Sequence, residues 1–251
     1  MAETAKAALL AELRSRIRRM EGLGGEAGGG VLPFGVAELD AGLPDGGLPL
    51  SCLHEVAAED PGAGTAFAAA LLARLAAARG APVLWVVRGR DLHAAGLAAY
   101  GLTPERLIAV RAERTADALW ALEEALRCTR LSAVLGEVGR LDLTASRRLQ
   151  LAAEAGGVTG LLLHLGEERA GAASAAVTRW RVAPAPSDPL GEPGVGEPGV
   201  GEPRWRLDLL RCRGGRPGSW TVGWRDGALA GDRAALAGDA PPRAGRFAAV
   251  A

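Results

Sequence analysis

The stretch VAAEDPGAGTAFAAALLARLAAA, residues 56–78, decides the fold because it joins a short apolar segment to a long helix through a polar turn that contains glycine and proline. This is the outline of a phosphate-binding loop, G-x-x-x-x-G-K-[ST], whose glycines let backbone N–H groups turn toward phosphates where a helix begins. The helix predicted over residues 65–79 is apolar on nearly every face, so we expect it to be buried. The stretch therefore predicts one strand–loop–helix unit of an α/β protein.

The loop lacks most of the groups that a phosphate site needs. With Thr65 aligned as the hydroxyl, the lysine position and the two glycine positions are occupied by Gly64, Ala63 and Ala58. The missing lysine removes the main cation that would face the phosphates, and Glu59 and Asp60 place negative charge where a phosphate would sit. The sequence therefore predicts a degenerate nucleotide site, with neither ATP nor magnesium as a cofactor and no ATPase activity.

Short apolar segments alternate with helical segments from residue 31 to residue 165. The predicted strands cover residues 52–56, 82–87, 107–112, 132–138 and 159–165. The helices predicted between them cover residues 65–79, 91–101, 115–128 and 143–156, with a further helix start at Thr103-Pro104-Glu105 and an N-cap at Thr115. Strands separated by helices imply right-handed crossovers and a parallel sheet covered on both faces.

Beyond residue 170 the pattern changes to that of antiparallel strands. Residues 178–182, 204–212 and 219–224 alternate or are rich in β-branched and aromatic residues. The segment 184–203 contains the repeated unit G-E-P-G-V and is expected to be a flexible loop, because it cannot build a core. The last segment, 228–251, is rich in Ala, Gly and Pro, which predicts a frayed tail or a partner-binding segment.

The N-terminal residues 1–21 form a separate unit. An amphipathic helix is predicted there, with one apolar stripe made by Leu10, Leu13, Ile17 and Met20. The glycine-rich segment 22–30 follows as a tether. Such a helix docks either on its own domain or on a partner, and the sequence leaves both possibilities open.

Composition excludes several classes of protein. The chain has 251 residues with 29 Lys+Arg and 29 Asp+Glu, so no strong global field attracts nucleic acid or an anionic membrane. We expect a cytoplasmic protein without a membrane span, since no segment has about 20 uninterrupted apolar residues. The three cysteines are isolated and the three histidines lack metal-ligand spacing, so no metal site is expected.

The segment before the loop, LPFGVAELDAGLPDGGLPLSCLHEV at residues 32–56, resembles the one that leads into the phosphate loop of the RecA recombinase superfamily. There the pattern TG-x-x-x-LD-x-x-L-x-GGLP-x-G precedes a strand ending in E-[IV]. The matching residues are Phe34, Gly35, Leu39, Asp40, Leu43, Gly46, Gly47, Leu48 and Pro49, followed by Glu55 and Val56. The resemblance implies that Glu137 takes the place of the magnesium-coordinating aspartate and His164 that of a polar sensor residue.

With the N-terminal helix and the segment RCRGGRPGSW at residues 211–220, the chain resembles the ImuA family of short bacterial RecA-like proteins, some of them described as SulA-like. The resemblance covers most of residues 31–227 and implies a RecA-like α/β domain with antiparallel C-terminal strands. The family works with ImuB, a catalytically inactive relative of Y-family polymerases, and with an error-prone replicative-type polymerase in the SOS response to DNA damage. The resemblance therefore implies a non-catalytic accessory or scaffold protein of translesion synthesis, a form of DNA repair that causes mutagenesis.

Arginine and tryptophan alternate in the C-terminal strands. Phosphate pairing and base stacking on these residues would hold single-stranded DNA, and Trp and Arg are also frequent anchors of protein interfaces. The alternative is that the tryptophans pack inside the sheet while the arginines stay in water. The residues concerned are Trp180, Trp205, Arg211, Arg213, Arg216 and Trp220.

Two other functions remain open from the sequence. The first is an atypical ATPase in which Thr65 and Glu137 bind magnesium and Arg88 or Arg90 replaces the lysine. The second is an inhibitor that mimics a RecA protomer and blocks filament assembly or cell division. RecA and a second copy of the chain are accordingly further candidate partners.

Overall fold

The computed structural model describes residues 30–89, 91–166, 174–187 and 201–231. The predicted N-terminal helix with Leu10, Leu13, Ile17 and Met20, nearly all of the glycine-rich tether, most of the repeat loop and residues 232–251 lie outside the described residues. Arg90, a candidate substitute for the missing lysine, lies outside them as well.

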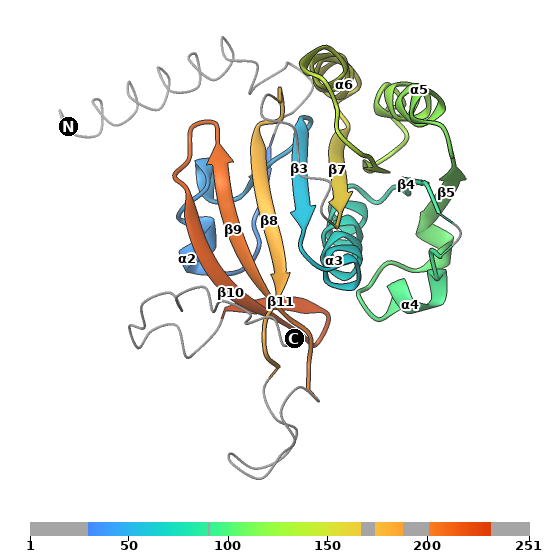
Figure 1. The fold of residues 1–251 in the computed structure, drawn as a ribbon. Coiled ribbons are helices and arrows are strands. Elements are labelled where there is room, and N and C mark those ends of the chain that lie inside the picture. The colour runs from blue at the N-terminus through green and yellow to red at the C-terminus, as the bar shows by residue number, and fades with distance from the viewer. Residues whose placement is uncertain (1–29, 90, 167–173, 188–200, 232–251) are drawn as a thin grey trace, which may run out of the picture.

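A nine-stranded mixed sheet forms the centre of the described structure, in the order β11-β10-β9-β8-β3-β7-β6-β4-β5 (Figure 1). The strands from β8 to β5 in this order pair in parallel, whereas β9, β10 and β11 pair antiparallel. The bounds are β3 Leu53–Ala58, β4 Val83–Val87, β5 Leu107–Arg111, β6 Ala133–Glu137, β7 Thr159–Leu165, β8 Thr178–Pro184, β9 Arg204–Cys212, β10 Gly218–Arg225 and β11 Ala228–Gly231. A separate two-stranded sheet pairs β1 (Val31–Leu32) with β2 (Leu48–Pro49). The predicted α/β class, with a mostly parallel sheet and antiparallel C-terminal strands, is confirmed.

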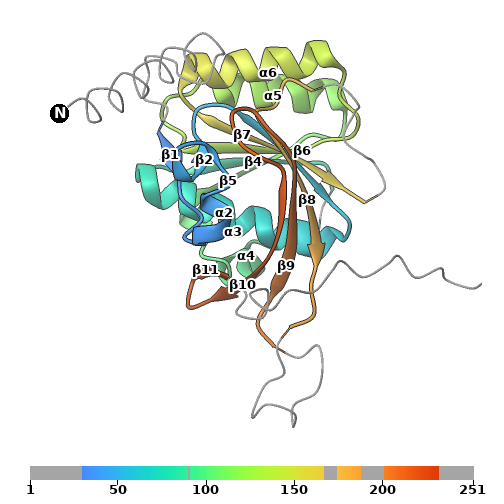
Figure 2. The ribbon, with the colours of Figure 1, turned by 90° about the vertical axis from the view of Figure 1, so that its left-hand side faces the viewer.

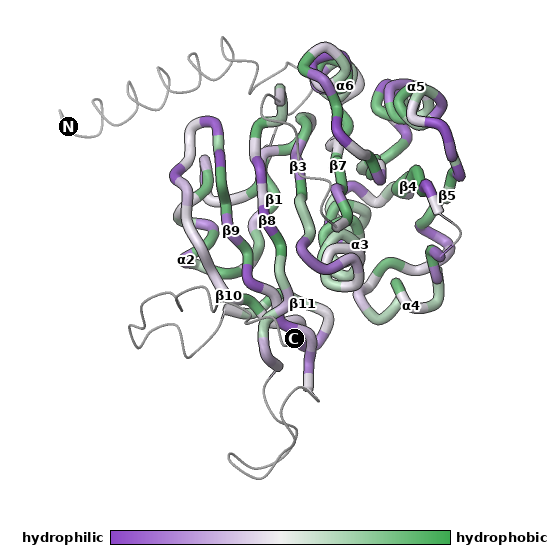
Figure 3. The backbone as a smooth tube through the Cα atoms, in the orientation of Figure 1, coloured by the Kyte–Doolittle hydropathy of each residue, from purple (hydrophilic) through white to green (hydrophobic). Residues whose placement is uncertain are grey.

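Helices cover both faces of this sheet. Figure 2 shows α5 and α6 on one side, and α2, α3 and α4 on the other. The bounds are α2 Ala37–Asp40, α3 Pro61–Arg79, α4 Ala94–Ala98, α5 Thr115–Leu126 and α6 Leu143–Gly156, with single 3₁₀ turns at Pro44–Gly46 and Pro104–Arg106. In Figure 3 the inner strand β4 is mostly hydrophobic, as expected for a parallel strand with both faces covered.

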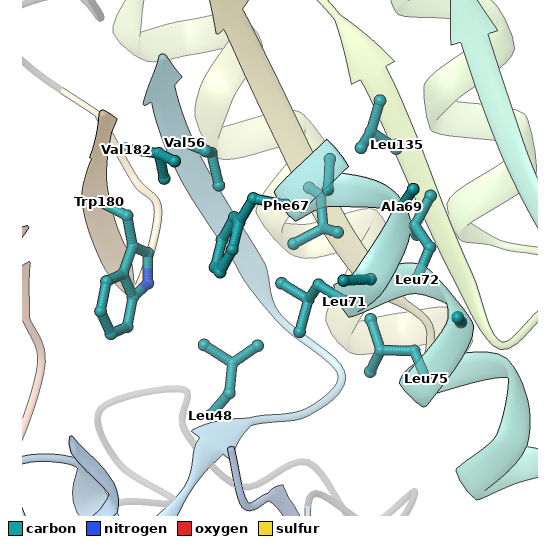
Figure 4. Packing of buried hydrophobic residues seen from close by; sticks show 14 of the residues in the cluster. Leu48, Val56, Phe67, Ala69, Leu71, Leu72, Leu75, Leu135, Trp180 and Val182 are labelled. Carbon is teal, nitrogen blue, oxygen red and sulfur yellow. The ribbon is translucent and has the colours of Figure 1, made fainter. Parts of the chain in front are cut away.

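The core is built around α3, whose side chains are buried on nearly every side. Figure 4 shows its leucines and Phe67 packed among residues from β3, β6 and β8. The antiparallel strands bend round the helix, so that the ring of Phe67 lies 5.9 Å from the ring of Trp205 on β9. By length and composition α3 could cross a membrane, but 61% of its most apolar window is buried inside the protein. In this structure α3 is therefore a core helix of the α/β domain.

Three local predictions are corrected by the structure. Thr103-Pro104-Glu105 starts only a 3₁₀ turn, because the chain enters β5 directly at Leu107. The N-cap of α5 is the extended residue Arg114, so Thr115 is the first helical residue. Strand β11 pairs with β10 over residues 228–231, which moves the start of the expected tail from residue 228 to residue 232.

A buried histidine lies at the start of β3. His54 is completely buried, and its Nε2 lies 2.9 Å from the carbonyl oxygen of Pro49 while its Nδ1 lies 2.7 Å from Oγ1 of Thr178. A carbonyl only accepts, so Nε2 carries the proton and the Thr178 hydroxyl donates to Nδ1. Both ring nitrogens are thus satisfied in the neutral form, and burial lowers the pKa of His54 to about 4.

We expect acid to destabilise the fold through His54. In the unfolded chain the imidazole binds a proton at its ordinary pKa of about 6.5, whereas in the folded chain its pKa is about 4. The contribution of the neutral imidazole to the free energy of unfolding is therefore fully present above about pH 6.5 and is lost as the pH falls from there toward 4. The free energy of unfolding should fall by about 2 kcal/mol between pH 7.5 and pH 5. Urea denaturation at both values measures this. His54→Gln should remove most of the dependence, whereas a His93→Gln control at the exposed histidine should keep it; equal dependence in both variants would contradict the assignment.

Candidate functional site

The strand–loop–helix unit lies at the carboxyl edge of the parallel strands. Strand β3 ends at Ala58 and α3 begins at Pro61, so only Glu59 and Asp60 join them. Asp60 is the N-cap of α3, where its carboxylate accepts a hydrogen bond of 2.7 Å from the N–H of Ala63. A phosphate would bind such N–H groups at the start of a helix. The carboxylate of Asp60 therefore occupies the place that an anionic ligand would take.

Gly64, which stands where a phosphate-binding loop has its lysine, has a packing role. Gly64 is buried, and a Cβ atom built on it would lie 2.3 Å from the Cβ of Ala58. Its N–H donates to the carbonyl of Asp60 at 2.9 Å within the first turn of α3. Ala58 and Gly64 thus form the contact that holds α3 against the end of β3. A side chain at position 64 cannot be accommodated while Ala58 and the helix keep their places.

A cleft of about 340 Å³ opens beside the start of α3. It brings together Thr65 and Glu137, as the alignment with a phosphate loop predicts, whereas Ala58, Ala63 and Gly64 are not among the residues that line it. Its other polar lining residues are Asp91, His93 and Tyr100. The described residues of this lining include two carboxylates and neither lysine nor arginine, which disfavours a polyphosphate.

Glu137, at the end of β6, is held by the protein itself. Its Oε1 accepts from the indole Nε1 of Trp85 at 3.0 Å and its Oε2 accepts from the backbone N–H of Arg88 at 3.1 Å. Arg88 lines a second cleft, of about 380 Å³, that shares Glu137 with the first. Within the described part of the chain, no group of three His, Cys, Asp or Glu residues is placed to hold a metal ion.

Two residues of the site were not found from the sequence. Tyr100 lines the first cleft, and its ring lies 6.0 Å from that of Trp205 and 6.1 Å from that of Trp224, so it connects the cleft to the tryptophans of the C-terminal strands. Burial raises the pKa of the Tyr100 hydroxyl. His93 caps α4, where its Nδ1 accepts from the N–H of Gly96. The only available signal for Tyr100 is that it is the sole tyrosine of the chain.

His164, which the resemblance to RecA-like proteins places at the polar sensor position, is also a packed residue. His164 is buried in β7, where it pairs with Ala57 of β3. Side chains alternate along a strand, so His164 faces away from its neighbours Leu163 and Leu165, both of which belong to the α3 side of the core. Neither described cleft is lined by His164.

The tryptophans of the C-terminal strands point into the core. Trp180 is 2% exposed and Trp205 is 1% exposed, so of the two alternatives these tryptophans follow the one in which they pack inside the sheet. Trp220 is partly buried, with its ring 6.3 Å from that of Trp180. The rings of Trp180 and Trp205 face α3, because alternate residues of β8 and β9 lie on that side of the sheet.

The arginines near residue 211 mainly bind backbone. Arg211 donates to the carbonyls of Ser174 and Ala176, and Arg213 donates to the carbonyl of Ala175 at 3.1 Å. Burial, and then the charges of neighbouring arginines, lower the pKa of Arg211. Arg216 is exposed and could still contact a partner. Arg211 and Arg213 therefore connect the end of β9 to the chain before β8.

The outward face of β8 and β9 is electrostatically balanced. Arg181 and Arg206 lie near Asp208 at 3.9 and 3.6 Å, and both also approach Glu59. Deeper in the sheet, Arg179 donates to Glu55 at 2.8 Å. Because these arginines face carboxylates, the field that they offer to phosphate groups is reduced.

The fold and the site together define an α/β protein in which the loop at the phosphate-binding position is closed by the protein's own side chains. No family model matches the chain. The chain is 44% identical over 211 residues to the protein named Protein ImuA of Caulobacter vibrioides strain NA1000 / CB15N, a match that covers 76% of this chain and 82% of that protein. The Protein ImuA of strain ATCC 19089 / CIP 103742 / CB 15 matches to the same extent. The chain belongs to the ImuA family.

Restoring the lysine should damage the fold without creating a nucleotide site. We expect Gly64→Lys to lower the free energy of unfolding by about 1 to 3 kcal/mol, because the new Cβ overlaps that of Ala58. The double variant Ala58→Gly with Gly64→Lys should recover part of this loss. Ala77→Lys, at an exposed position of the same helix, is the matched control and should change little. Urea denaturation measures all four proteins; a Gly64→Lys variant as stable as the wild type would contradict this packing argument.

Proposed function

We propose that this chain is a non-catalytic accessory or scaffold protein of a translesion synthesis complex formed after DNA damage. Membership of the ImuA family supports a role in damage-induced mutagenesis. The observation that carries the non-catalytic part is the closed loop, in which Ala58 fills the space of the lysine stem and Asp60 caps the helix. A loop built in this way stabilises the fold of the domain, and we propose that it catalyses no reaction.

The proposed partners are an ImuB-like inactive relative of Y-family polymerases and an error-prone replicative-type polymerase. We propose that the complex forms in the cytoplasm. RecA is a further candidate. Single-stranded DNA is a weaker candidate, since Trp180 and Trp205 are buried and the arginines beside them are occupied. What remains for DNA is the exposed Arg216.

An atypical ATPase is the second candidate function. The observation in its favour is that Thr65 and Glu137 line one cleft and that Arg88 lines the cleft next to it. Against it stands the use of both Glu137 oxygens by Trp85 and the backbone of Arg88, which leaves magnesium to compete with existing hydrogen bonds.

Calorimetry with ATP and magnesium separates these two functions. We expect no binding at ATP concentrations up to about 1 mM, which corresponds to a binding free energy weaker than about −4 kcal/mol. Micromolar binding of ATP that is abolished by Thr65→Ala would contradict the non-catalytic proposal. Thr65→Ser, which keeps the hydroxyl, is the matched control, because it should retain any genuine binding.

The partner proposal is tested by affinity purification from DNA-damaged cells. We expect the full chain to recover a polymerase-related protein, and versions lacking residues 1–21 or 232–251 to show which terminus carries the contact. The second deletion starts at residue 232 because β11 belongs to the sheet. If no polymerase-related partner is recovered with the full chain, the proposed role in the complex is wrong.

A further inference from the structure

The outer surface of α5 and α6 carries the two most exposed large hydrophobic side chains of the described residues. Trp120 on α5 is 68% exposed and Leu151 on α6 is 63% exposed. Single exposed hydrophobic residues are ordinary in soluble proteins. These two, however, lie on helices that run side by side on the same face of the sheet (Figures 1 and 2).

Trp120 and Leu151 stand at the same level of the two helices. The helices lead into the parallel strands β6 and β7, so they run in the same direction. They also end together, because a Cβ atom built on Gly156 of α6 would lie 2.0 Å from the carbonyl oxygen of Leu126 of α5. At 1.5 Å per residue, Trp120 lies about 9 Å back from the end of α5, and Leu151 about 8 Å back from the end of α6.

Both side chains point away from the sheet. With about 100° of rotation per residue, the buried residues two positions before and after Trp120 lie about 200° round α5 from it. The buried residue two positions before Leu151 lies equally far round α6. A single helix laid along the contact line between α5 and α6 would therefore cover both side chains. We call Trp120, Leu151 and this contact line the α5–α6 face.

The charges of the α5–α6 face do not select an occupant. At the contact line, Glu123 of α5 accepts from Arg127 at 2.9 Å and also from Arg148 of α6, so these charges are matched within the chain. The outer flanks are mixed, with two carboxylates on α5 and one charge of each sign on α6: Asp117, Glu124, Arg147 and Glu154. An occupant must therefore be selected by its apolar surface and by its access to the face.

The described chain begins beside the end of α6. The carbonyl of Gly30 accepts a hydrogen bond of 2.9 Å from the N–H of Leu50. The next residue, Ser51, donates from its hydroxyl to the carbonyl of Gly157, the C-cap of α6, at 3.1 Å. Residues 1–29, which lie outside the described residues, therefore join the domain at the end of α6.

The glycine-rich segment 22–29 is long enough to bring residues 1–21 over the α5–α6 face. A flexible chain of this length has an r.m.s. span of about 16 Å and extends to at most about 28 Å. Leu151 lies only about 8 Å along α6 from the end at which the chain is anchored. The face is thus within easy reach of the tether.

The helix predicted from the sequence of residues 1–21 has an apolar surface of matching length. As a helix, residues 10–20 would be about 15 Å long, against about 18 and 21 Å for the 12-residue α5 and the 14-residue α6. An amphipathic helix commonly binds by laying its apolar side on such a surface. The residues that form its apolar stripe are Leu10, Leu13, Ile17 and Met20.

We propose that residues 1–21 dock as an amphipathic helix on the α5–α6 face of their own domain, with the apolar stripe on Trp120 and Leu151. Because the tether is anchored at the end of α6, the docked helix runs in the same direction as α5 and α6, with Met20 toward their C-terminal ends. Of the two docking possibilities that the sequence leaves open, this is the one within the chain. It is independent of the proposed role in translesion synthesis.

The tether lets a weak contact hold the helix in place. A short flexible linker gives an effective concentration of about 1 mM. A contact with a Kd of about 100 μM is then occupied about ten times more often than not. Docking within one chain also has to be independent of protein concentration.

Trypsin digestion of the full chain, followed by mass spectrometry, tests the docking. We expect cleavage within residues 1–21 to be about tenfold slower than in a synthetic peptide of residues 1–29, because a docked helix has to open before it is cut. The rate should be the same at 1 and at 100 μM protein, and sedimentation should show a monomer at both. The cleavage sites followed are Arg14, Arg16, Arg18 and Arg19.

Variants of the face test where the helix docks. Trp120→Gln and Leu151→Gln should each raise the cleavage rate at least threefold without a change of charge. Leu210→Gln is the matched control, because Leu210 is also an exposed hydrophobic residue, on β9, two strands from β3 in the sheet. It should keep the rate of the unchanged chain. Circular dichroism verifies that each variant is folded.

Variants of the helix test the contact from the other side. Ile17→Gln, in the apolar stripe, should also raise the rate at least threefold, whereas Ser15→Gln, on the opposite side of the predicted helix, should not. The double variant Ile17→Gln with Trp120→Gln should be cut little faster than the faster of its two single variants. Two residues of one contact are not additive, whereas separate effects on helix formation and on the domain would add.

Four results would overturn the proposal. They are cleavage as fast as in the free peptide, protection that survives Trp120→Gln, protection that is lost in Leu210→Gln, and additive effects in the double variant. Protection that disappears on dilution from 100 to 1 μM would also overturn it, in favour of docking on a second copy of the chain.

Discussion

The burial of α3 is the constraint on which the rest of the structure depends. A 19-residue helix with hardly any polar face cannot lie on the outside of a sheet, because its apolar surface would remain in water. The parallel strands cover one side of it and contribute Trp180 of β8, and the antiparallel strands bend to cover another with Trp205. The small α2 and α4 segments lie on the same side of the sheet. The larger hydrophobic cluster contains most of the buried residues of this helix.

The same constraint explains why the loop is closed. Small residues at both ends of the loop let α3 approach β3 until Gly64 and Ala58 are in direct contact. Close approach leaves only two residues for the turn, and Asp60 then caps the helix from the position that an anion would occupy in an open loop. Tight packing and phosphate binding are therefore alternatives at this place. In this domain the contact between Gly64 and Ala58 and the cap at Asp60 hold the start of α3 in place.

Much of the fold could be predicted because it depends on local patterns. The buried helix, the strands on either side and the change to alternating strands after residue 170 are visible in the periodicity of the apolar residues. The altered loop could be predicted because residue types alone showed that lysine and both glycines were absent. The sequence did not reveal that Glu137 is bound by Trp85, because these two residues are 52 positions apart in the chain. Nor did it reveal that Tyr100 lies in the same cleft as Glu137, which is more than 30 positions away. The faces of Trp180 and Trp205 were undecided for the same reason, because alternation identifies two faces without saying which one is covered.

The sequence by itself determined the order of the elements, the burial of α3 and the absence of the catalytic cation, because these follow from which residues stand next to one another in the chain. Only the tertiary structure decided that position 64 has no room for a side chain, that His54 is neutral between Pro49 and Thr178, and that Trp120 is left in water. Each of these depends on the distance between segments that are remote in sequence. That distance is fixed by how the whole core packs, which no local pattern records.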